Sequence, residues 1–224
     1  MSFNGVIFDF NGTLFWDTPY HNQAWNTFLK AHNIQLSDDE MIRKVHGKPN
    51  SEIFREIFGN DITEEDIERM IFEKETIYRR ICSKRTMELA PGAIDLLEWL
   101  LGKRIPFTIA TASGKGNLDF YFEQLLLGKW FDFRKVIYDN ESFRGKPNPD
   151  TFLLAARQLQ LHPEEIVVFE DSFAGILAAQ NAGAGKIYIV NSNNDDYRQW
   201  QHDKITDFAQ VSRNIFYKDQ GLSS

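Results

Sequence analysis

The sequence has a single cysteine, Cys82, among its 224 residues, so no intramolecular disulfide can form. The cysteine content therefore gives no sign of an oxidising compartment. No apolar run approaches the roughly 18 residues that a membrane-spanning helix requires. The first residues, Met1 to Gly5, also lack the basic-then-apolar pattern of a signal peptide. We expect a cytoplasmic protein that does not enter a membrane.

An excess of positive charge is missing too. The chain has 25 Lys and Arg against 32 Asp and Glu, a net charge of −7. Nucleic acid and anionic membranes favour a basic face, so we expect neither as a partner. The sequence contains neither a Walker-type glycine loop nor Gly-x-Gly-x-x-Gly, which excludes nucleotide binding by those routes. We expect a monomer that holds any anionic substrate with a few local cations and a metal.

What the chain does have is a set of short apolar runs rich in β-branched and aromatic residues. Because these runs are continuous rather than alternating, they are typical of strands buried on both faces of a parallel sheet. The runs are Val6–Phe10, Phe107–Thr111, Val136–Tyr138, Ile166–Phe169 and Ile187–Val190. Helical patterns lie between the later runs, at Ala93–Leu101, Asp150–Leu161 and Ser172–Ala182. This alternation predicts a doubly wound α/β domain with a parallel sheet.

The stretch from residue 17 to residue 87 differs because it contains no convincing strand. Its helical patterns are His21–His32, Asp38–Val45, Ser51–Phe58 and Glu64–Ser83. We therefore predict a core domain formed by residues 1–16 and 88–224, with a small all-helical cap, residues 17–87, inserted after the first strand. Near the C-terminus, Ile205–Val211 is compatible with a strand or a helix.

Polar residues follow the ends of four predicted strands. Asp9 ends the first, Thr111 the second, Lys146 follows the third, and Glu170 and Asp171 end the fourth. The carboxyl ends of parallel strands meet at one edge of a sheet, where ligands bind. Three converging carboxylates suit a hard divalent cation, and Mg²⁺ is the usual one with phosphate. The sequence predicts a site for Mg²⁺ and a small phosphorylated metabolite.

Four ordered segments carry a resemblance to a known family. They are Asp9-Phe-Asn-Gly-Thr-Leu, Ile109-Ala-Thr-Ala-Ser, Gly145-Lys-Pro-Asn-Pro-Asp and Phe169-Glu-Asp-Ser-Phe-Ala-Gly-Ile-Leu-Ala-Ala. Together they resemble the motifs of the haloacid dehalogenase superfamily, whose core is Rossmann-like. The helical insert, with Asp17-Thr-Pro-Tyr-His and Val45-His-Gly-Lys-Pro-Asn, is similar to the cap of the β-phosphoglucomutase-like branch.

The resemblance implies that Asp9 attacks phosphorus and forms an aspartyl-phosphate. Mg²⁺ would be held by Asp9, Asp171, Glu170 and the main-chain carbonyl of Asn11. Glu170 has two alternative roles, binding the metal through water or capping the next helix, and Ser172 is predicted to be that helix's cap. The predicted phosphate contacts are the side chains of Lys146 and Thr111 and the backbone around Gly12, Ala112 and Ser113.

Asn11 departs from the family pattern, which usually places a second Asp there as acid and base. An amide cannot exchange a proton near neutral pH, and losing such help slows turnover about 10²–10⁴-fold. Three hypotheses follow: a slower phosphatase, a protein that binds phosphorylated ligands with little turnover, or an Asn that was either introduced by substitution to stall catalysis or deamidates before Gly12.

Candidate substrate contacts in the cap are His21, His46, Gly47, Lys48 and Lys74. For His21 the alternative is an ordinary helix position. For Lys74, flanked by Glu73 and Glu75, the favoured alternative is a solvated charge cluster. Cys82 is predicted to be a buried structural residue. The aromatic residues predicted to form the cap core are Trp16, Trp25, Phe54, Phe58 and Phe72.

Among functions, the sequence favours hydrolysis over a β-phosphoglucomutase-type transfer, because Asn11 cannot supply the acid–base help that transfer needs. The Glu170-Asp171 pair indicates a divalent metal, whereas a dehalogenase needs none. A phosphonatase needs a lysine in the first cap helix, where only Lys30 occurs, late in the segment.

Overall fold

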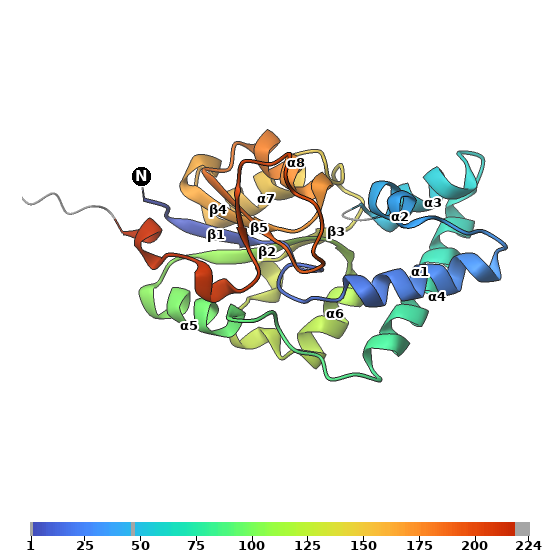
Figure 1. Ribbon diagram of the computed structural model, residues 1–224, viewed down its shortest axis with the longest axis horizontal. Helices are drawn as coiled ribbons and strands as arrows, with labels where there is room; N and C mark the ends of the chain where they lie inside the picture. The colour runs from blue at the N-terminus through green and yellow to red at the C-terminus, as the bar shows by residue number, and fades with distance from the viewer. Residues whose placement is uncertain (1, 46–47, 218–224) are drawn as a thin grey trace, which may run out of the picture.

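A six-stranded parallel sheet forms the centre of the computed structural model, which describes residues 2–45 and 48–217 (Figure 1). The strands lie in the order β3-β2-β1-β4-β5-β6. They are β1 (Gly5–Phe8), β2 (Phe107–Gly114), β3 (Ile137–Asp139), β4 (Ile166–Glu170), β5 (Lys186–Val190) and β6 (Asp203–Ile205). All five predicted strands are confirmed with shifted ends. The undecided C-terminal stretch forms β6 and a short 3₁₀ helix, Phe208–Gln210.

Helices cover both faces of the sheet, as the doubly wound prediction requires (Figure 1). On β1, Val6 and Phe8 pack into one apolar cluster with residues of α5 (Ala93–Lys103) and α6 (Lys115–Gln124). Ile7, between them, points to the opposite cluster, formed with α7 (Asp150–Leu159) and α8 (Phe173–Ala182). Successive strand residues point to opposite faces of the sheet, and both faces are buried here. Every residue of the strand must therefore be apolar, which gives a continuous apolar run.

Among the described residues, helix α6 is the one long element that the sequence patterns do not predict. It opens with Lys115, Gly116 and Asn117, and its apolar residues are crowded together rather than spaced along one stripe. Tertiary packing overrides this weak local signal, because Leu118 and Tyr121 are fully buried against the sheet.

Four helices between β1 and α5 form a separate group at one end of the sheet, here called the cap helices (Figure 1). Their own apolar cluster includes Trp25, Phe28 and Phe54. They are α1 (Thr18–Ala31), α2 (Asp38–Lys44), α3 (Asn50–Phe58) and α4 (Glu64–Cys82). Side-chain caps help to define their ends: Ser37 and Glu40 form a capping box on α2, and the Thr63 hydroxyl accepts from the Asp66 amide on α4.

The aromatic predictions for the cap are confirmed in part. Trp25 and Phe54 are buried in its core, and Phe58 packs against it. Trp16 instead packs against the main core cluster, and Phe72 is wrong, because 70% of it is exposed on α4. Cys82 is fully buried at the end of α4, and burial raises the pKa of its thiol to about 12, in line with a structural role.

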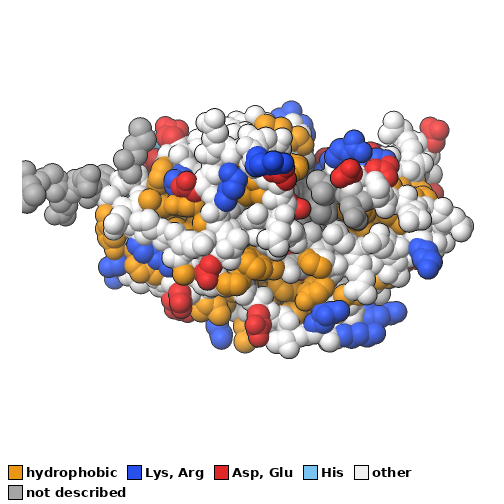
Figure 2. All heavy atoms as spheres, viewed as in Figure 1, with side chains coloured by type: hydrophobic (Ala, Val, Ile, Leu, Met, Phe, Trp, Pro, Cys, Tyr) orange, Lys and Arg blue, Asp and Glu red, His pale blue; other side chains and the backbone are white. Residues whose placement is uncertain are grey.

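The topology fixes where a site can form. β1 lies between β2 and β4, so the chain winds to one side of β1 and then to the other. Phe8 is paired with Ile109 and with Phe169, which brings Asp9, Thr111 and Glu170 to the same edge. Basic and acidic side chains intermingle on the face in Figure 2. Within the part of the chain that the structure describes, each helix is too short or too polar to cross a bilayer.

Candidate active site

Three carboxylates meet at the carboxyl ends of β1 and β4. Asp9, Glu170 and Asp171 each offer one oxygen such that these atoms all lie within 4.8 Å of one another. The Lys146 ammonium lies 2.6 Å from both Asp9 Oδ1 and Glu170 Oε1 and is only 1% exposed. The sequence therefore predicted four residues that the structure does bring together, and we call them the core cluster.

The core cluster carries more negative than positive charge, and the pKa values reflect this. Burial raises the pKa of Asp9 to about 7, although Lys146 opposes the rise. Burial and the neighbouring Glu170 and Asp9 carboxylates raise the pKa of Asp171 well above its usual range. Carboxyls held away from water beside one another are costly to ionise unless a cation joins them. Such a donor set, rich in oxygen, fits a hard divalent cation.

Glu170 differs from the two aspartates in its partners. Its Oε2 accepts from the Ser172 amide at 2.6 Å and the Ser172 hydroxyl at 3.0 Å, while Oε1 faces Lys146. Asp9 and Asp171 line the pocket, whereas Glu170 is fully buried behind it. The Ser172 hydroxyl also accepts from the Gly175 amide at 3.0 Å, which confirms Ser172 as the cap of α8.

The turn after β1 requires glycine at position 12. Gly12 has φ +79°, and a Cβ there would lie 2.0 Å from Asp171 Oδ2. Its amide is already donated to the Phe15 carbonyl at 2.7 Å and to Asp17 Oδ1 at 3.0 Å. The Gly12 amide is thus engaged within the turn here, and its part in binding phosphate stays a prediction. Gly12 lets the turn pass close to Asp171.

The end of β2 forms the next part of the wall. Thr111, Ala112 and Ser113 all line the pocket, as predicted. The Ser113 hydroxyl donates to Asn11 Oδ1 at 2.7 Å, and its amide donates to the Thr111 hydroxyl at 3.1 Å. Thr111 lies 3.4 Å from Asn11 Oδ1. These contacts tie the two loops together beside Asp9.

Asn11 has its amide nitrogen fixed by residues that sequence reasoning missed. Nδ2 donates to Asp17 Oδ2 at 2.7 Å and to the Tyr121 hydroxyl at 2.8 Å. Asp17 is completely buried and also accepts from the Tyr78 hydroxyl. The Asp17 carboxylate can only accept, so it favours a donor at position 11, and the Asn11 amide supplies one. An Asp at the first residue of the predicted cap, only six residues after Asn11, was the available signal.

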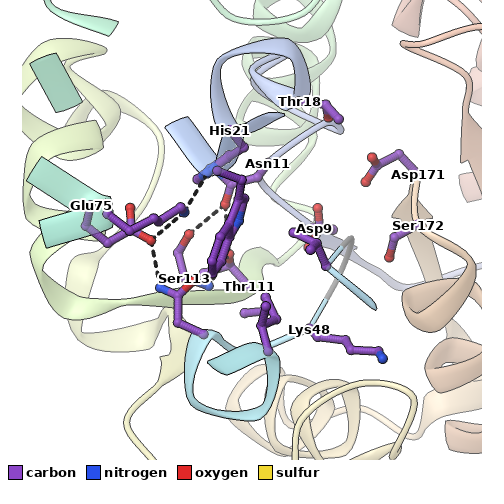
Figure 3. A pocket seen from close by; sticks show the side chains of 16 residues that line it. Asp9, Asn11, Thr18, His21, Lys48, Glu75, Thr111, Ser113, Asp171 and Ser172 are labelled. Carbon is purple, nitrogen blue, oxygen red and sulfur yellow. Dashed lines mark hydrogen bonds and ion pairs between the residues drawn. The ribbon is translucent and has the colours of Figure 1, made fainter. Parts of the chain in front are cut away.

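The cap helices supply the opposite wall, and Figure 3 places Glu75 and Asp171 at opposite sides of the pocket. His21 Nδ1 lies 3.1 Å from the Lys74 ammonium, His21 Nε2 lies 3.3 Å from Asp17 Oδ2, and the ring stacks on Tyr78. Lys74 is 1% exposed, so the solvated charge cluster expected around it is wrong.

The remaining cap candidates have different outcomes. Lys48 lines the pocket, with its ammonium 2.7 Å from Glu56 Oε2. His46 and Gly47 lie outside the described residues. Trp25, Asn50 and Glu75 line the pocket without having been predicted to do so, because only the packing of α1, α3 and α4 brings them together.

Comparison with known proteins agrees with this geometry. A family model described as a haloacid dehalogenase-like hydrolase matches residues 3–183. The chain is 30% identical over 195 residues to the phosphorylated carbohydrates phosphatase of Thermotoga maritima, covering 85% of this chain and 87% of that protein.

Two solved structures show the same architecture. A haloacid dehalogenase hydrolase of family IA, variant 3, from Entamoeba histolytica has a TM-score of 0.84 and 35% identity, covering 96% of this chain and 97% of that one. A putative β-phosphoglucomutase from Thermotoga maritima has a TM-score of 0.63 and 28% identity, covering 88% of this chain and 89% of that one.

Proposed function

The chain belongs to the haloacid dehalogenase-like hydrolase family, in its β-phosphoglucomutase-like branch, and we propose that it is a Mg²⁺-dependent phosphatase of small phosphorylated metabolites, sugar phosphates foremost. The observation that carries the proposal is the position of Asp9. Its carboxylate lines the pocket at the end of β1, beside a buried lysine and two further carboxylates.

Asp9 would be the nucleophile. One of its oxygens forms a bond to phosphorus while the bond to the ester oxygen breaks, and that oxygen leaves with its electron pair and takes a proton from solvent water. Water then attacks the phosphorus of the aspartyl-phosphate, which releases inorganic phosphate and restores Asp9. Lys146, held 2.6 Å from Asp9 Oδ1, would neutralise charge on the phosphoryl oxygens, and the Thr111 hydroxyl would donate to one of them.

The metal would be held by Asp9, Asp171 and the main-chain carbonyl of Asn11. When bound, Mg²⁺ would supply positive charge that offsets the negative charges of the attacking carboxylate and the phosphate. Glu170 keeps Lys146 in position through its Oε1 and anchors the start of α8 through its Oε2. Asp171, which faces the pocket, would thus bind the metal, while Glu170, buried behind it, would position Lys146.

Asn11 supports hydrolysis at a modest rate over mutase chemistry. A sugar phosphomutase must move protons at two substrate oxygens, and the Asn11 amide is held by Asp17, Tyr121 and Ser113. An amide can orient a water or a hydroxyl group but cannot exchange a proton with it. Esters with good leaving groups should therefore turn over fastest.

The test is an assay of sugar phosphates and an aryl phosphate with and without Mg²⁺. We expect Mg²⁺-dependent release of phosphate from the parent, and a loss of at least about 10³-fold in Asp9→Ala. The matched control is Asp119→Ala, because Asp119 is an exposed residue of α6. Equal activity in the parent and Asp9→Ala would overturn the role given to Asp9.

A further inference from the structure

The cap side of the pocket holds a buried ion pair that the proposed chemistry does not use. Lys74 Nζ lies 2.8 Å from Glu75 Oε1, and both side chains line the pocket. Lys74 is 1% exposed and Glu75 is 6% exposed. We call Lys74 and Glu75 the cap pair.

Two amides complete the surroundings of Glu75. Asn50 Nδ2 donates to Oε1 and Asn117 Nδ2 donates to Oε2, each at 2.6 Å. Burial alone would raise the pKa of Glu75, but the charges of Lys74 and His21 and the hydrogen bonds from Lys74 and Asn117 lower it to about 2. Glu75 is therefore ionised at neutral pH, and its charge balances that of Lys74.

The cations on this side are all occupied, as far as the described residues show. Besides Lys74, the lysine that lines the pocket is Lys48, which is paired with Glu56 at 2.7 Å. A phosphate group placed here would lose its hydration without gaining an uncompensated positive charge, because the charges of Lys74 and Glu75 balance each other. Burying a charged group without such compensation opposes binding strongly.

The other groups on this side suit hydroxyls. Trp25 and Ile53 give the wall apolar surfaces, with the Lys74 ammonium 4.9 Å from the centre of the Trp25 ring. Asn50 and Glu75 offer an amide and a carboxylate beside them. A hydroxyl group both donates and accepts, so it can join such a network without bringing charge.

We propose that the cap pair makes the pocket selective for phosphate monoesters whose far end is uncharged and bears hydroxyls, and that it rejects a second phosphate. This inference rests on the proposed function, because it takes the core cluster as the site of the first phosphate. Glu75 is the specificity-determining residue, and Lys74 keeps it in place.

The experiment compares fructose 6-phosphate with fructose 1,6-bisphosphate in the Mg²⁺-loaded protein. We expect kcat/KM to be roughly 10- to 100-fold higher for the monophosphate, since a buried charge without a partner changes discrimination by that order. Glu75→Gln should reduce the ratio about tenfold, because it leaves the charge of Lys74 unbalanced and able to pair with the second phosphate. Glu75→Asp, which keeps the charge, should retain most of the discrimination.

The matched control is Glu73→Gln. It makes the same charge change two positions earlier on α4, at a side chain that is 48% exposed and faces His32. We expect its substrate ratio to equal that of the parent. Melting temperatures of all variants check that each one is folded.

Calorimetric titration of both esters into Asp9→Asn with Mg²⁺ separates this inference from the proposed function. Preferential binding of the monophosphate that Glu75→Gln removes would support the cap pair even if the parent showed no turnover. Equal affinity for the two esters, no binding of either, or a ratio that Glu75→Gln leaves unchanged would overturn the inference.

Discussion

The pocket region contains two buried lysines, Lys146 and Lys74, whose surroundings differ in charge. Each is 1% exposed. Lys146 has two carboxylates at 2.6 Å, and Asp171 completes a cluster of three acids around one base. Lys74 has one carboxylate, Glu75 at 2.8 Å, and a histidine nitrogen at 3.1 Å.

The pKa values of the carboxyl groups express this difference. Burial raises the pKa of Asp9 to about 7 in the core cluster, whereas at Glu75 the neighbouring charges and hydrogen bonds, those of Lys74 foremost, together outweigh burial and the pKa falls to about 2. The core cluster thus has an excess of negative charge that favours a bound cation. The cap pair is complete by itself, so it can contribute hydrogen bonds but little net charge.

The largest effect is expected when each lysine is replaced in turn, which tests whether the core cluster and the cap pair differ in this way. Lys146→Met leaves Asp9 Oδ1 and Glu170 Oε1 without their shared donor. We expect it to lower the free energy of unfolding by about 3–5 kcal/mol in metal-free buffer and to abolish turnover. Lys74→Met should lower the free energy of unfolding by only about 1–2 kcal/mol, since Glu75 keeps other hydrogen-bond donors.

The smaller effect at Lys74 has a specific cause. Both oxygens of Glu75 keep an amide donor, from Asn50 and Asn117. Urea unfolding of the two variants and the parent measures the difference. Equal destabilisation by the two substitutions would break the distinction between the clusters.

In Figure 3, Asn11 lies between Glu75 and Asp171, and replacing it tests whether the site lacks an acid. In Asn11→Asp, the new carboxyl would lie beside the buried Asp17 carboxylate, which now accepts from Asn11 Nδ2 at 2.7 Å. The neighbouring charge would raise the pKa of the new carboxyl and keep it protonated. We expect turnover of sugar phosphates to rise about 10²-fold or more.

An aryl phosphate, whose leaving group needs no proton, should gain little from Asn11→Asp. The gain should be present below the raised pKa and disappear as the pH rises through it. Asn11→Ala is the control, because it removes the amide contacts without adding an acid. A similar gain for both esters, or a gain in Asn11→Ala, would contradict an acid role at this position.

Response to Mg²⁺ gives the next contrast. At 100-fold excess over its Kd, a bound ion stabilises the folded chain by about 2.7 kcal/mol. For a chain of this size, that corresponds to a rise in melting temperature of about 5–10 °C. Asp171→Asn should lose most of this rise, while Glu75→Gln should keep it, because Glu75 belongs to the cap pair. Loss of the Mg²⁺-induced rise in melting temperature in Glu75→Gln would mean that the core cluster and the cap pair are not independent.

The strands and the core cluster could be predicted from the sequence because their signals are local. A continuous apolar run marks a buried strand, and Asp9, Thr111 and Glu170 each stand at the end of such a run. Parallel pairing then places these strand ends at one edge whatever the details of the loops. Lys146 was predictable by the same logic, since it follows β3.

The cap side could not be predicted, because its contacts join residues distant in sequence. Asn11 meets Tyr121 and Glu75 meets Asn117, both through α6, the helix whose pattern was too weak to identify. Lys74 between two glutamates resembles a solvated cluster in sequence. Successive helical residues point about 100° apart, however, so only the packing of α4 against α1 decides which of them is buried.

The smallest expected effect concerns the acid stability that Glu75 provides. Its pKa falls from 4.5 in the unfolded chain to about 2 in the folded one, because the charges of Lys74 and His21 and the hydrogen bonds from Lys74 and Asn117 together outweigh the effect of burial. A depressed carboxyl pKa stabilises the folded state fully above pH 4.5, and this contribution is lost as the pH falls toward 2. Between pH 5 and pH 3 we expect the stability advantage of the parent over Glu75→Gln to shrink by about 1–2 kcal/mol.

Urea unfolding at several pH values in that window measures the advantage, and Glu73→Gln is again the control. Glu73 is 48% exposed, so its variant should track the parent across the window. An advantage that stays constant with pH would mean that Glu75 is not held as a carboxylate by Lys74. The cap pair would then lack the balanced charge that sets it apart from the core cluster, and the argument for rejecting a second phosphate would fall with it.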